Sequence, residues 1–271
     1  MKYFDQHVHT LFSADSKEDP AVYAETAANA GLERFVSTEH LEFDWNNEKR
    51  DWIPDFAAQK KLYADLSQRY GISMEQGVEL GYKSDKISDF NAIIADNALT
   101  HVNLSVHDYR GYDLYYAHND MFSPEEVIEG NLIRIEEAVD SAIDFDILSH
   151  VDYAFKTMYA EDQSLCIEKW EKRLESIFRT LASRQKALEI NLKVQSVIKS
   201  RKHLTYLLGL FRSCGGRFIA LSSDAHRAEK YLSDLPFYAA VIAECGFESL
   251  CFFVDRKPCL EKISALFPFG K

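Results

Sequence analysis

The chain has 271 residues, of which 46% are hydrophobic and 27% are charged, as in an ordinary folded globular protein. This composition excludes a disordered or fibrous chain. The sequence contains no run of 18 apolar residues, which is the length needed to cross a membrane. The net charge of −12 argues against nucleic acid as the main partner, because proteins that bind it usually carry a basic surface. The first residues lack the apolar stretch of a signal peptide, and the five cysteines form no Cys-x-x-Cys motif. We therefore expect a cytoplasmic protein without a disulfide framework.

Short apolar runs that predict β-strands alternate with longer segments of helical periodicity. The expected strands are, in chain order, Tyr3–Val8, Arg34–Thr38, Met74–Leu80, His101–Val106, Phe145–Ser149, Ala187–Asn191, Phe218–Ser222 and Leu250–Val254. The expected helices run from Pro20 to about Gly31, Pro54–Tyr70, Ser123 to about Ala142, Gln163–Arg184, Thr205–Cys214 and Ala228–Cys245. Asp19 before Pro20 has the pattern of an N-cap, and Ser123 with Glu126 has that of a capping box.

This alternation predicts an α/β fold in which helices cover a parallel sheet. The number of strand–helix units and the chain length favour a TIM-like barrel formed by a single domain, residues 1–271. A doubly wound open sheet is the alternative. No Gly-x-Gly-x-x-Gly follows the first expected strand, which weakens a dinucleotide-binding version of that fold.

Six of the nine histidines lie at or just beyond the end of an expected strand: His7, His9, His40, His107, His150 and His226. The carboxylates Glu79 and Asp224 occupy equivalent places. In a parallel barrel all these strand ends meet at one face, where active sites form. Imidazoles and carboxylates without thiolates suit zinc, manganese or iron(II). The other three histidines, at 101, 118 and 203, are expected to be solvated.

The same segments carry a family resemblance. Asp5-Gln6-His7-Val8-His9-Thr10, Thr38-Glu39-His40, Val78-Glu79-Leu80, Ser105-Val106-His107, Ser149-His150-Val151-Asp152 and Ser223-Asp224-Ala225-His226 resemble the successive motifs of the polymerase and histidinol phosphatase (PHP) superfamily. They follow the expected order over residues 5 to 226, and the length resembles that of its single-domain phosphatases. The resemblance implies a distorted (β/α)7 barrel.

The resemblance also implies three divalent metal ions, with zinc, iron or manganese as candidates. The first would be held by His7, His9, Glu79 and Asp224, and the second by Glu79, His107 and His150. The third would be held by His40 and His226, with Asp15 completing the set where some relatives use histidine.

The resemblance departs at the run Glu189-Ile190-Asn191-Leu192-Lys193-Val194, where related phosphatases often read Glu-Ile-Asn-Thr-Ser-Gly with an arginine soon after. This departure leaves the cation that binds phosphate unassigned. The candidate substrate-binding residues are Arg110, Lys156, Asn191 and Lys193, with Lys199 as a further possibility.

The implied activity is hydrolysis of L-histidinol phosphate to L-histidinol and phosphate in histidine biosynthesis. A hydroxide bridging two metals would attack the phosphoryl group. The candidate acid–base residues are Asp15, His40, Asp224 and His226. Acidic residues near the active face could bind the cationic end of this small-molecule phosphate monoester: Asp108, Asp113, Glu42 or Asp152. Aromatic residues could pack on its imidazole: Phe43, Trp45, Trp52, Tyr109 and Tyr112. A nucleotide phosphatase or nuclease on the same scaffold and a non-catalytic metal-binding module are the alternatives.

Overall fold

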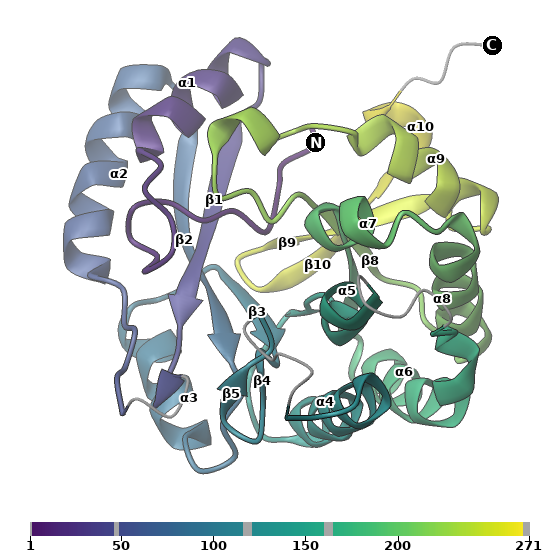
Figure 1. Cartoon of the computed structure of the whole chain (residues 1–271). Coiled ribbons are helices and arrows are strands. Elements are labelled where there is room, and N and C mark those ends of the chain that lie inside the picture. Colours follow the sequence, from purple (N-terminus) through teal and green to yellow (C-terminus); the bar gives the residue numbers. More distant parts are fainter. Residues whose placement is uncertain (1, 46–48, 116–120, 160–164, 268–271) are drawn as a thin grey trace.

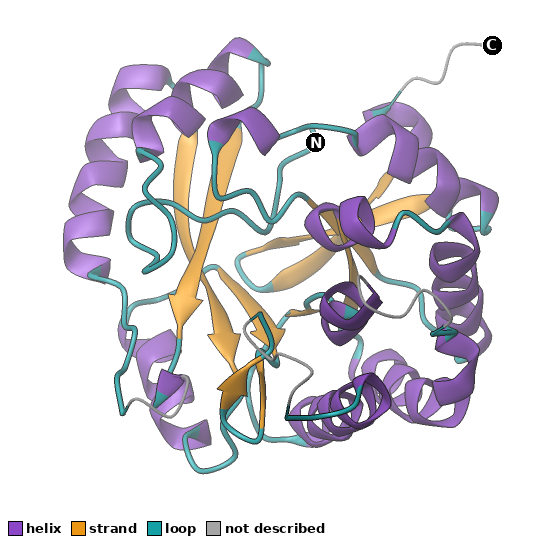
Figure 2. Ribbon diagram, viewed as in Figure 1, coloured by secondary structure: helices purple, strands orange, loops and turns teal. Residues whose placement is uncertain are grey.

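Six parallel strands form the centre of the computed structural model, which describes residues 2–45, 49–115, 121–159 and 165–267 (Figure 1). They are β1 (Arg34–Leu41), β2 (Ser73–Gly81), β3 (His101–Ser105), β6 (Ile147–Leu148), β7 (Ala187–Asn191) and β8 (Ile219–Ser222). Their order in the sheet is β1-β2-β3-β6-β7-β8, which follows the chain without a reversal. A doubly wound sheet needs a point where the order reverses, so that alternative does not fit. The sheet curls into half of a barrel (Figure 2).

Helices connect and cover these strands. They are α1 (Pro20–Asn29), α2 (Phe56–Tyr70), α3 (Ile87–Asp96), α4 (Pro124–Asp140), α5 (Tyr153–Tyr159), α6 (Glu171–Arg184), α7 (Leu192–Ile198), α8 (Arg201–Ser213), α9 (Leu235–Glu244) and α10 (Ile263–Leu266). The expected caps are confirmed: Asp19 accepts a hydrogen bond from the backbone of Ala21, and Ser123 forms a capping box with Glu126. None of the helices in the described part of the chain is long and apolar enough to span a membrane.

The main hydrophobic core lies between the sheet and the helices that cover it. Strand residues such as Val78, Leu104 and Leu188 are fully buried there, together with Phe178 and Phe211 from helices α6 and α8. Each such side chain contributes about 1.5–3 kcal/mol by leaving water. This packing holds the sheet rigid and fixes the positions of the strand ends.

The first expected strand, Tyr3–Val8, is not a strand of the sheet. Residue Val8 forms only an isolated bridge, to Ala225. Its carbonyl accepts a hydrogen bond from the backbone N–H of Thr38 (2.8 Å), and the N–H of His9 donates to the carbonyl of Ala225 (2.8 Å). The segment therefore lies between β1 and β8. The Gln6 side chain, rather than the backbone, bonds Cys251 and Phe253, which interrupts regular pairing.

The C-terminal part also differs from the prediction. Leu250–Val254 falls in β9 (Ser249–Val254), which pairs antiparallel with β10 (Lys257–Lys262) instead of joining the parallel sheet. The helix expected over Ala228–Cys245 is interrupted, because only a 3₁₀ turn forms at Ala228–Lys230 before α9 begins at Leu235. Pro236 explains the break, since proline fits the first turn of a helix but not its interior.

Two of the three histidines that were expected to be solvated are buried. His101 lies at the start of β3, where its ring meets the ring of Phe4 edge-on, with centroids 5.8 Å apart. His203 lies on α8, and its Nε2 contacts a carboxylate oxygen of Asp152 at 3.0 Å. Both predictions were wrong because local polarity cannot reveal partners that are distant in sequence. The third, at position 118, lies outside the described residues.

The burial of His101 predicts a loss of stability in acid. Burial and the nearby Arg34 guanidinium lower the pKa of His101 to about 3. In the unfolded chain a histidine has a pKa of about 6.5, so the unfolded chain takes up a proton at a higher pH than the folded protein does. The free energy of unfolding is therefore highest above pH 6.5 and decreases as the pH falls from 6.5 towards 3. By pH 4 the loss amounts to roughly 3 kcal/mol.

We expect His101→Gln to flatten the pH dependence of unfolding between pH 7 and pH 4 by about this amount, because glutamine takes up no proton. The measurement is urea denaturation at several pH values, with chelator present so that metal release does not contribute. Parallel pH profiles for the variant and the parental protein would show that His101 is not the group responsible.

Candidate metal centre

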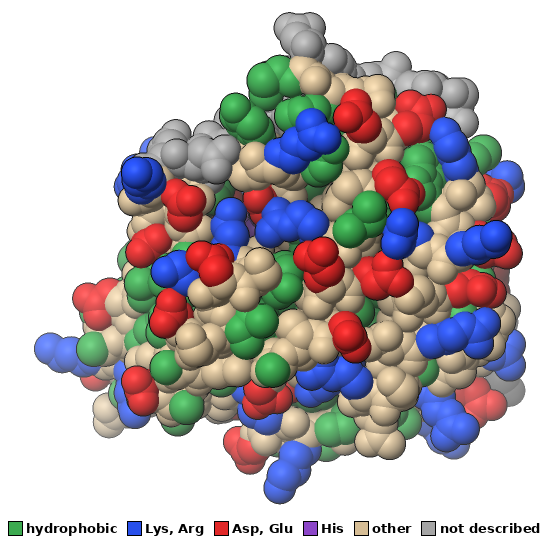
Figure 3. Space-filling view, turned by 90° about the horizontal axis from the view of Figure 1, so that it is seen from below, with side chains coloured by type: hydrophobic (Ala, Val, Ile, Leu, Met, Phe, Trp, Pro, Cys, Tyr) green, Lys and Arg blue, Asp and Glu red, His purple; other side chains and the backbone are tan. Residues whose placement is uncertain are grey.

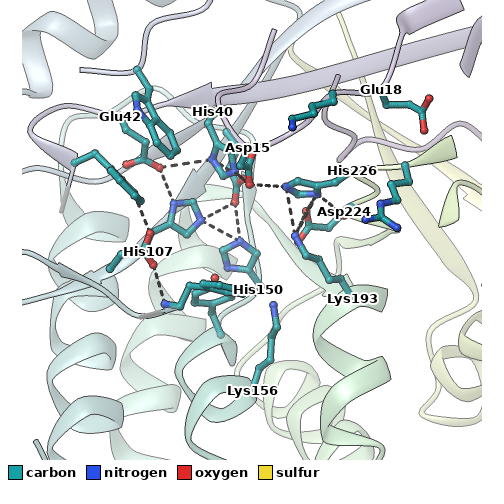
Figure 4. Close-up of a pocket in the computed structure, with 18 residues that line it drawn as sticks. Asp15, Glu18, His40, Glu42, His107, His150, Lys156, Lys193, Asp224 and His226 are labelled. Atoms are coloured by element: carbon teal, nitrogen blue, oxygen red, sulfur yellow. Dashed lines mark hydrogen bonds and ion pairs between the residues drawn. The ribbon is translucent and has the colours of Figure 1, made fainter. Parts of the chain in front are cut away.

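A cavity of about 800 Å³ opens at the C-terminal ends of the parallel strands (Figure 4). Strand pairing positions its first two ligand candidates, because His40 of β1 stands beside Glu79 of β2 in the register. The other histidines come from the turns that follow β3, β6 and β8, and from the N-terminal segment between β1 and β8. All nine residues predicted as metal ligands are brought together here: His7, His9, Asp15, His40, Glu79, His107, His150, Asp224 and His226.

Glu79 lies at the centre of this group and is 1% exposed. One of its oxygens, Oε2, is 3.1 Å from Nε2 of His7 and 3.3 Å from Nε2 of His9. The other, Oε1, is 2.6 Å from Nε2 of His150 and 3.0 Å from Nε2 of His107. The two oxygens therefore face two separate sets of imidazoles. This is the arrangement of a carboxylate that bridges two cations.

Asp224 completes the first of these sets. Its Oδ1 lies 3.4 Å from Nε2 of His9 and 3.8 Å from Nε2 of His7. The residue has a positive φ of 53°, so the turn after β8 directs its carboxylate back into the site. Aspartate and asparagine adopt this left-handed conformation more readily than most residues.

A third group lies at the rim of the cavity. Oδ2 of Asp15 is 2.9 Å from Nε2 of His226 and 3.5 Å from Nε2 of His40. The Asp15 side chain is 41% exposed, whereas that of His40 is 12% exposed, so this group borders solvent. Asp15, His40 and His226, together with His9, form a cluster with ligand spacing.

Acceptors behind the histidines fix which ring nitrogen faces the site. Nδ1 of His7 donates to Glu189 at 2.7 Å, and Nδ1 of His107 donates to Glu42 at 2.7 Å. The Nε2 atoms therefore point into the site, and those of His7 and His9 lie only 3.1 Å apart. Histidines that bind metals are usually oriented in this way. The arrangement fits a cation between the rings.

Two further observations support a cation. Nδ1 of His40 is buried and makes no hydrogen bond of good geometry, although Oε2 of Glu79 lies 3.3 Å away. Burial opposes protonation of His7, yet Glu189, Glu79 and Asp224 raise its pKa well above the usual value. The carboxylates thus create a site that takes up positive charge. The mixed set of imidazole and carboxylate ligands suits zinc, iron(II) or manganese.

Two lysines face these groups across the cavity. Lys193, at the start of α7, places its Nζ 3.4 Å from Oδ1 of Asp224 and 3.2 Å from Nδ1 of His226. Lys156, on α5, lies over the ring of Tyr153 at 4.8 Å from its centroid. Burial and the nearby Lys193 charge lower the pKa of Lys156 to about 8. Figure 4 shows both lysines beside the ligand cluster.

The other two predicted substrate-binding residues do not line this cavity. Arg110 stacks its guanidinium over the rings of Tyr109 and Phe122, at 5.1 and 5.4 Å. Asn191 is 1% exposed and caps α7, with its side-chain oxygen accepting from the N–H of Val194 at 3.0 Å. Its amide nitrogen donates to Glu189 and Asp224, so Asn191 supports the ligands from behind.

An aromatic wall closes another side of the cavity. Trp45 and Trp52 stack with ring centroids 4.2 Å apart, and Nε1 of Trp45 donates to Asp113 at 2.9 Å. Both tryptophans, Glu42 and Asp113 line the cavity. The loop between the tryptophans includes residues 46–48, which lie outside the described part of the chain.

Asp152 does not belong to this wall. It is 2% exposed and accepts hydrogen bonds from Gln195 of α7 (2.7 Å) and His203 of α8 (3.0 Å). The expectation that it could bind the cationic end of a substrate is therefore wrong. Its carboxylate instead joins the start of α5 to α7, the two helices that carry Lys156 and Lys193.

Sequence reasoning missed the acceptors behind the ligands. Glu189 supports His7 through its ring and His150 through its backbone N–H, at 2.9 Å. A signal was present, because Glu189 lies in the expected strand Ala187–Asn191, close to the end where the other ligands cluster. Ser13 supports His9 at 3.0 Å, and no pattern in the sequence singled it out.

Comparisons with known proteins find relatives that match most of the chain. The chain is 28% identical over 266 residues to a histidinol-phosphatase of Lactococcus lactis, covering 95% of this chain and 96% of the relative. It is 27% identical over 233 residues to a probable histidinol-phosphatase of Clostridium acetobutylicum, covering 82% and 86% of the two chains.

Two solved structures have a similar fold. The histidinol phosphate phosphatase of L. lactis, complexed with zinc, L-histidinol and phosphate, gives a TM-score of 0.84 at 27% identity, covering 95% of this chain and 99% of that one. A putative histidinol phosphatase of Listeria monocytogenes gives a TM-score of 0.69 at 14% identity, covering 87% and 100%, which shows the shared fold alone. The PHP domain family model matches residues 5–193, more than half of the chain. The chain therefore belongs to the PHP domain family.

Proposed function

We propose that this protein is a metal-dependent phosphomonoesterase that hydrolyses L-histidinol phosphate to L-histidinol and phosphate in histidine biosynthesis. The observation that carries the proposal is the cavity in which Glu79 joins two sets of imidazoles while two lysines face them. Relatives named histidinol-phosphatases match nearly the whole chain. Because the substrate is an intermediate of amino-acid biosynthesis, we also propose a cytoplasmic location.

Three divalent ions, which we propose as zinc, iron or manganese, would be held by the predicted ligand sets. His7, His9, Glu79 and Asp224 would hold the first, Glu79, His107 and His150 the second, and Asp15, His40 and His226 the third. When bound, such ions neutralise charge on phosphoryl oxygens and supply a nucleophile from water at neutral pH. The same family relation supports a distorted (β/α)7 barrel, in which the segment containing His7 and His9 takes the place of a strand between β1 and β8.

The phosphoryl group would be oriented by the two lysines. Lys193 stands within 3.4 Å of Asp224, and Lys156 lines the same cavity. Two ammonium groups on one side, with the ligand cluster on the other, surround the phosphoryl oxygens with positive charge. Charge placed in this way stabilises the transition state of phosphoryl transfer.

The organic part of the substrate would lie against the aromatic wall. Histidinol phosphate carries a protonated amine and an imidazole. The Trp45–Trp52 stack offers a flat face for the ring, and cations bind favourably over such faces. Glu42 and Asp113, which line the same side, supply the negative charge that the amine requires.

We propose that Asp15 exchanges the proton needed by the leaving oxygen. Its carboxylate is the most exposed of the catalytic candidates Asp15, His40, Asp224 and His226. Burial opposes ionisation, but His40 and His226 lower the pKa of Asp15 well below its usual value, so it enters the reaction as a carboxylate. Oδ2 faces His40 and His226 in the proposed ligand set, so Oδ1 is the oxygen that would pass a proton from water to the leaving alkoxide.

The proposed partner is a small-molecule phosphate ester. On the face shown in Figure 3, the Lys and Arg side chains of the described residues are interspersed with Asp and Glu, so that no single basic patch covers it. This agrees with the net charge of −12 in disfavouring long nucleic acids.

The test is phosphate release by the metal-reconstituted protein from L-histidinol phosphate, compared with mononucleotides and sugar phosphates. We expect kcat/KM for L-histidinol phosphate to exceed the others at least about 100-fold, as expected where a site pairs with several polar groups of its substrate. Asp224→Asn is the control and is expected to be inactive, while asparagine tolerates the positive φ at this position.

If a nucleotide were the best substrate, the proposed metal centre would stand, but the proposed role in histidine biosynthesis would be refuted. No turnover of any phosphate ester by metal-loaded protein would favour the non-catalytic alternative.

A further inference from the structure

A carboxylate that belongs to none of the ligand groups is buried behind the metal centre. Glu39 is 0% exposed. It follows Thr38 on β1 and precedes His40, and because neighbouring strand residues point to opposite sides, its side chain turns away from the cavity. Its oxygens accept hydrogen bonds from the N–H of Thr10 (2.9 Å), the hydroxyl of Thr10 (2.6 Å), the hydroxyl of Ser13 (2.8 Å) and the amide of Gln59 (3.2 Å).

The hydroxyl of Ser13 links Glu39 to a ligand. A serine hydroxyl has one proton to donate and two lone pairs that accept. The proton goes to Oε2 of Glu39. One lone pair accepts from the backbone N–H of His40 at 3.0 Å, and Nδ1 of His9 lies 3.0 Å from the same oxygen.

This arrangement leaves only one role for the His9 ring. Because the Ser13 proton is already used, Nδ1 of His9 must carry a proton and donate it to Ser13. With Nδ1 donating to Ser13, Nε2 of His9 is the ring nitrogen left to bind a cation, and it faces Glu79 at 3.3 Å and Asp224 at 3.4 Å. The neighbouring ligands His7 and His107 donate directly to carboxylates, at 2.7 Å in each case.

We propose that Glu39, acting through the hydroxyl of Ser13, is a positioning residue that fixes the metal-binding tautomer of His9. The inference rests on the proposed metal-dependent function. Ser13 extends the reach of Glu39 because β1 directs the carboxylate away from the cavity. The negative charge of Glu39 reaches His9 through this hydrogen bond and strengthens its binding to a cation.

The experiment compares the affinity of Ser13→Ala and of the parental protein for zinc ion alone, by competition with a chromophoric chelator. We expect Ser13→Ala to bind one of its zinc ions about 10- to 100-fold less tightly than the parental protein does, which is the usual effect of losing such a partner. Ser13→Thr, which retains the hydroxyl, is expected to restore the affinity. Thr10→Val is the matched control, because it removes a hydroxyl that bonds Glu39 without touching His9.

The melting temperature of the metal-free proteins separates this role from a purely structural one. A structural role would lower the stability of Ser13→Ala and Thr10→Val alike and leave zinc affinity unchanged in both. Zinc affinity of Ser13→Ala within about threefold of the parental value, in folded protein, overturns the proposal.

A second measurement needs no variant that might fail to fold. Long-range ¹H–¹⁵N spectra of the zinc-loaded parental protein should show His9 protonated on Nδ1, and protonation on Nε2 would overturn the proposal. Failure of the proposed function looks different: the parental protein would then bind no zinc, or would bind it without hydrolysing phosphate esters. If the parental protein bound no zinc, the positioning role of Glu39 would be refuted as well. If it bound zinc without hydrolysing phosphate esters, the positioning role would be unaffected.

Discussion

Glu79→Gln is expected to abolish phosphatase activity and to release bound metal. The substitution replaces one carboxylate oxygen by an amide NH₂, which cannot bind a cation. Glutamine carries no charge, so both sets of imidazoles lose their anionic partner. Whichever oxygen is replaced, one set, either His7 and His9 or His107 and His150, also loses the oxygen that faces it. We expect kcat to fall about 1000-fold or more, corresponding to at least about 4 kcal/mol of transition-state stabilisation.

Metal analysis of the purified variant, together with its turnover of L-histidinol phosphate, checks this prediction. Glu75→Gln is the matched control, because Glu75 lies on the same strand but pairs with Arg34, at 3.0 Å, far from the ligands. It should retain parental activity and metal content. If Glu79→Gln kept its full complement of metal and a tenth of the activity, the bridging role of Glu79 would be refuted.

Replacement of both Lys156 and Lys193 should have the second largest effect. We expect Lys156→Met and Lys193→Met each to raise KM about 10-fold or more, and the double variant to lower kcat/KM at least about 1000-fold, because the phosphoryl dianion loses two cationic side chains that line its cavity. Inhibition by inorganic phosphate should weaken in parallel. Lys199→Met is the control, since Lys199 does not line the cavity.

The pH dependence distinguishes the two lysines. The pKa of Lys156 is lowered to about 8, so its ammonium loses charge as the pH rises through that value. KM of the parental enzyme should therefore increase above pH 8, and Lys156→Arg, which stays charged, should remove this increase. Steady-state kinetics between pH 6.5 and 9.5 provide the measurement. An unchanged phosphate inhibition constant in the double variant would show that the lysines do not bind the phosphoryl group.

The histidines of the site could be predicted from the sequence because they follow strands, and parallel strands bring their ends together. His40 and His107 illustrate this, since each stands at or directly after an apolar run that forms a strand of the sheet. The sequence order of the motifs was also sufficient to identify the family. What periodicity predicts is the local element and the face on which a side chain lies.

Partners that are distant in sequence could not be predicted in this way. His203 is polar and lies in a basic stretch, yet it is buried because Asp152, 51 positions earlier, accepts its hydrogen bond. The direction of β9 was equally hidden, because an apolar run is compatible with parallel or antiparallel pairing. The tautomer of His9 depends on Ser13 and Glu39, whose contact requires the folded arrangement of two segments.

The position of the N-terminal segment between β1 and β8 has a consequence for how the protein matures. His7 and His9 precede Asp224, which lies beside them in the site, by more than two hundred residues. The proposed first metal site is therefore incomplete until the turn after β8 has been synthesised and has docked against the segment that carries His7 and His9. Closing so long a loop is slow, and metal loading should accordingly be one of the last events in folding.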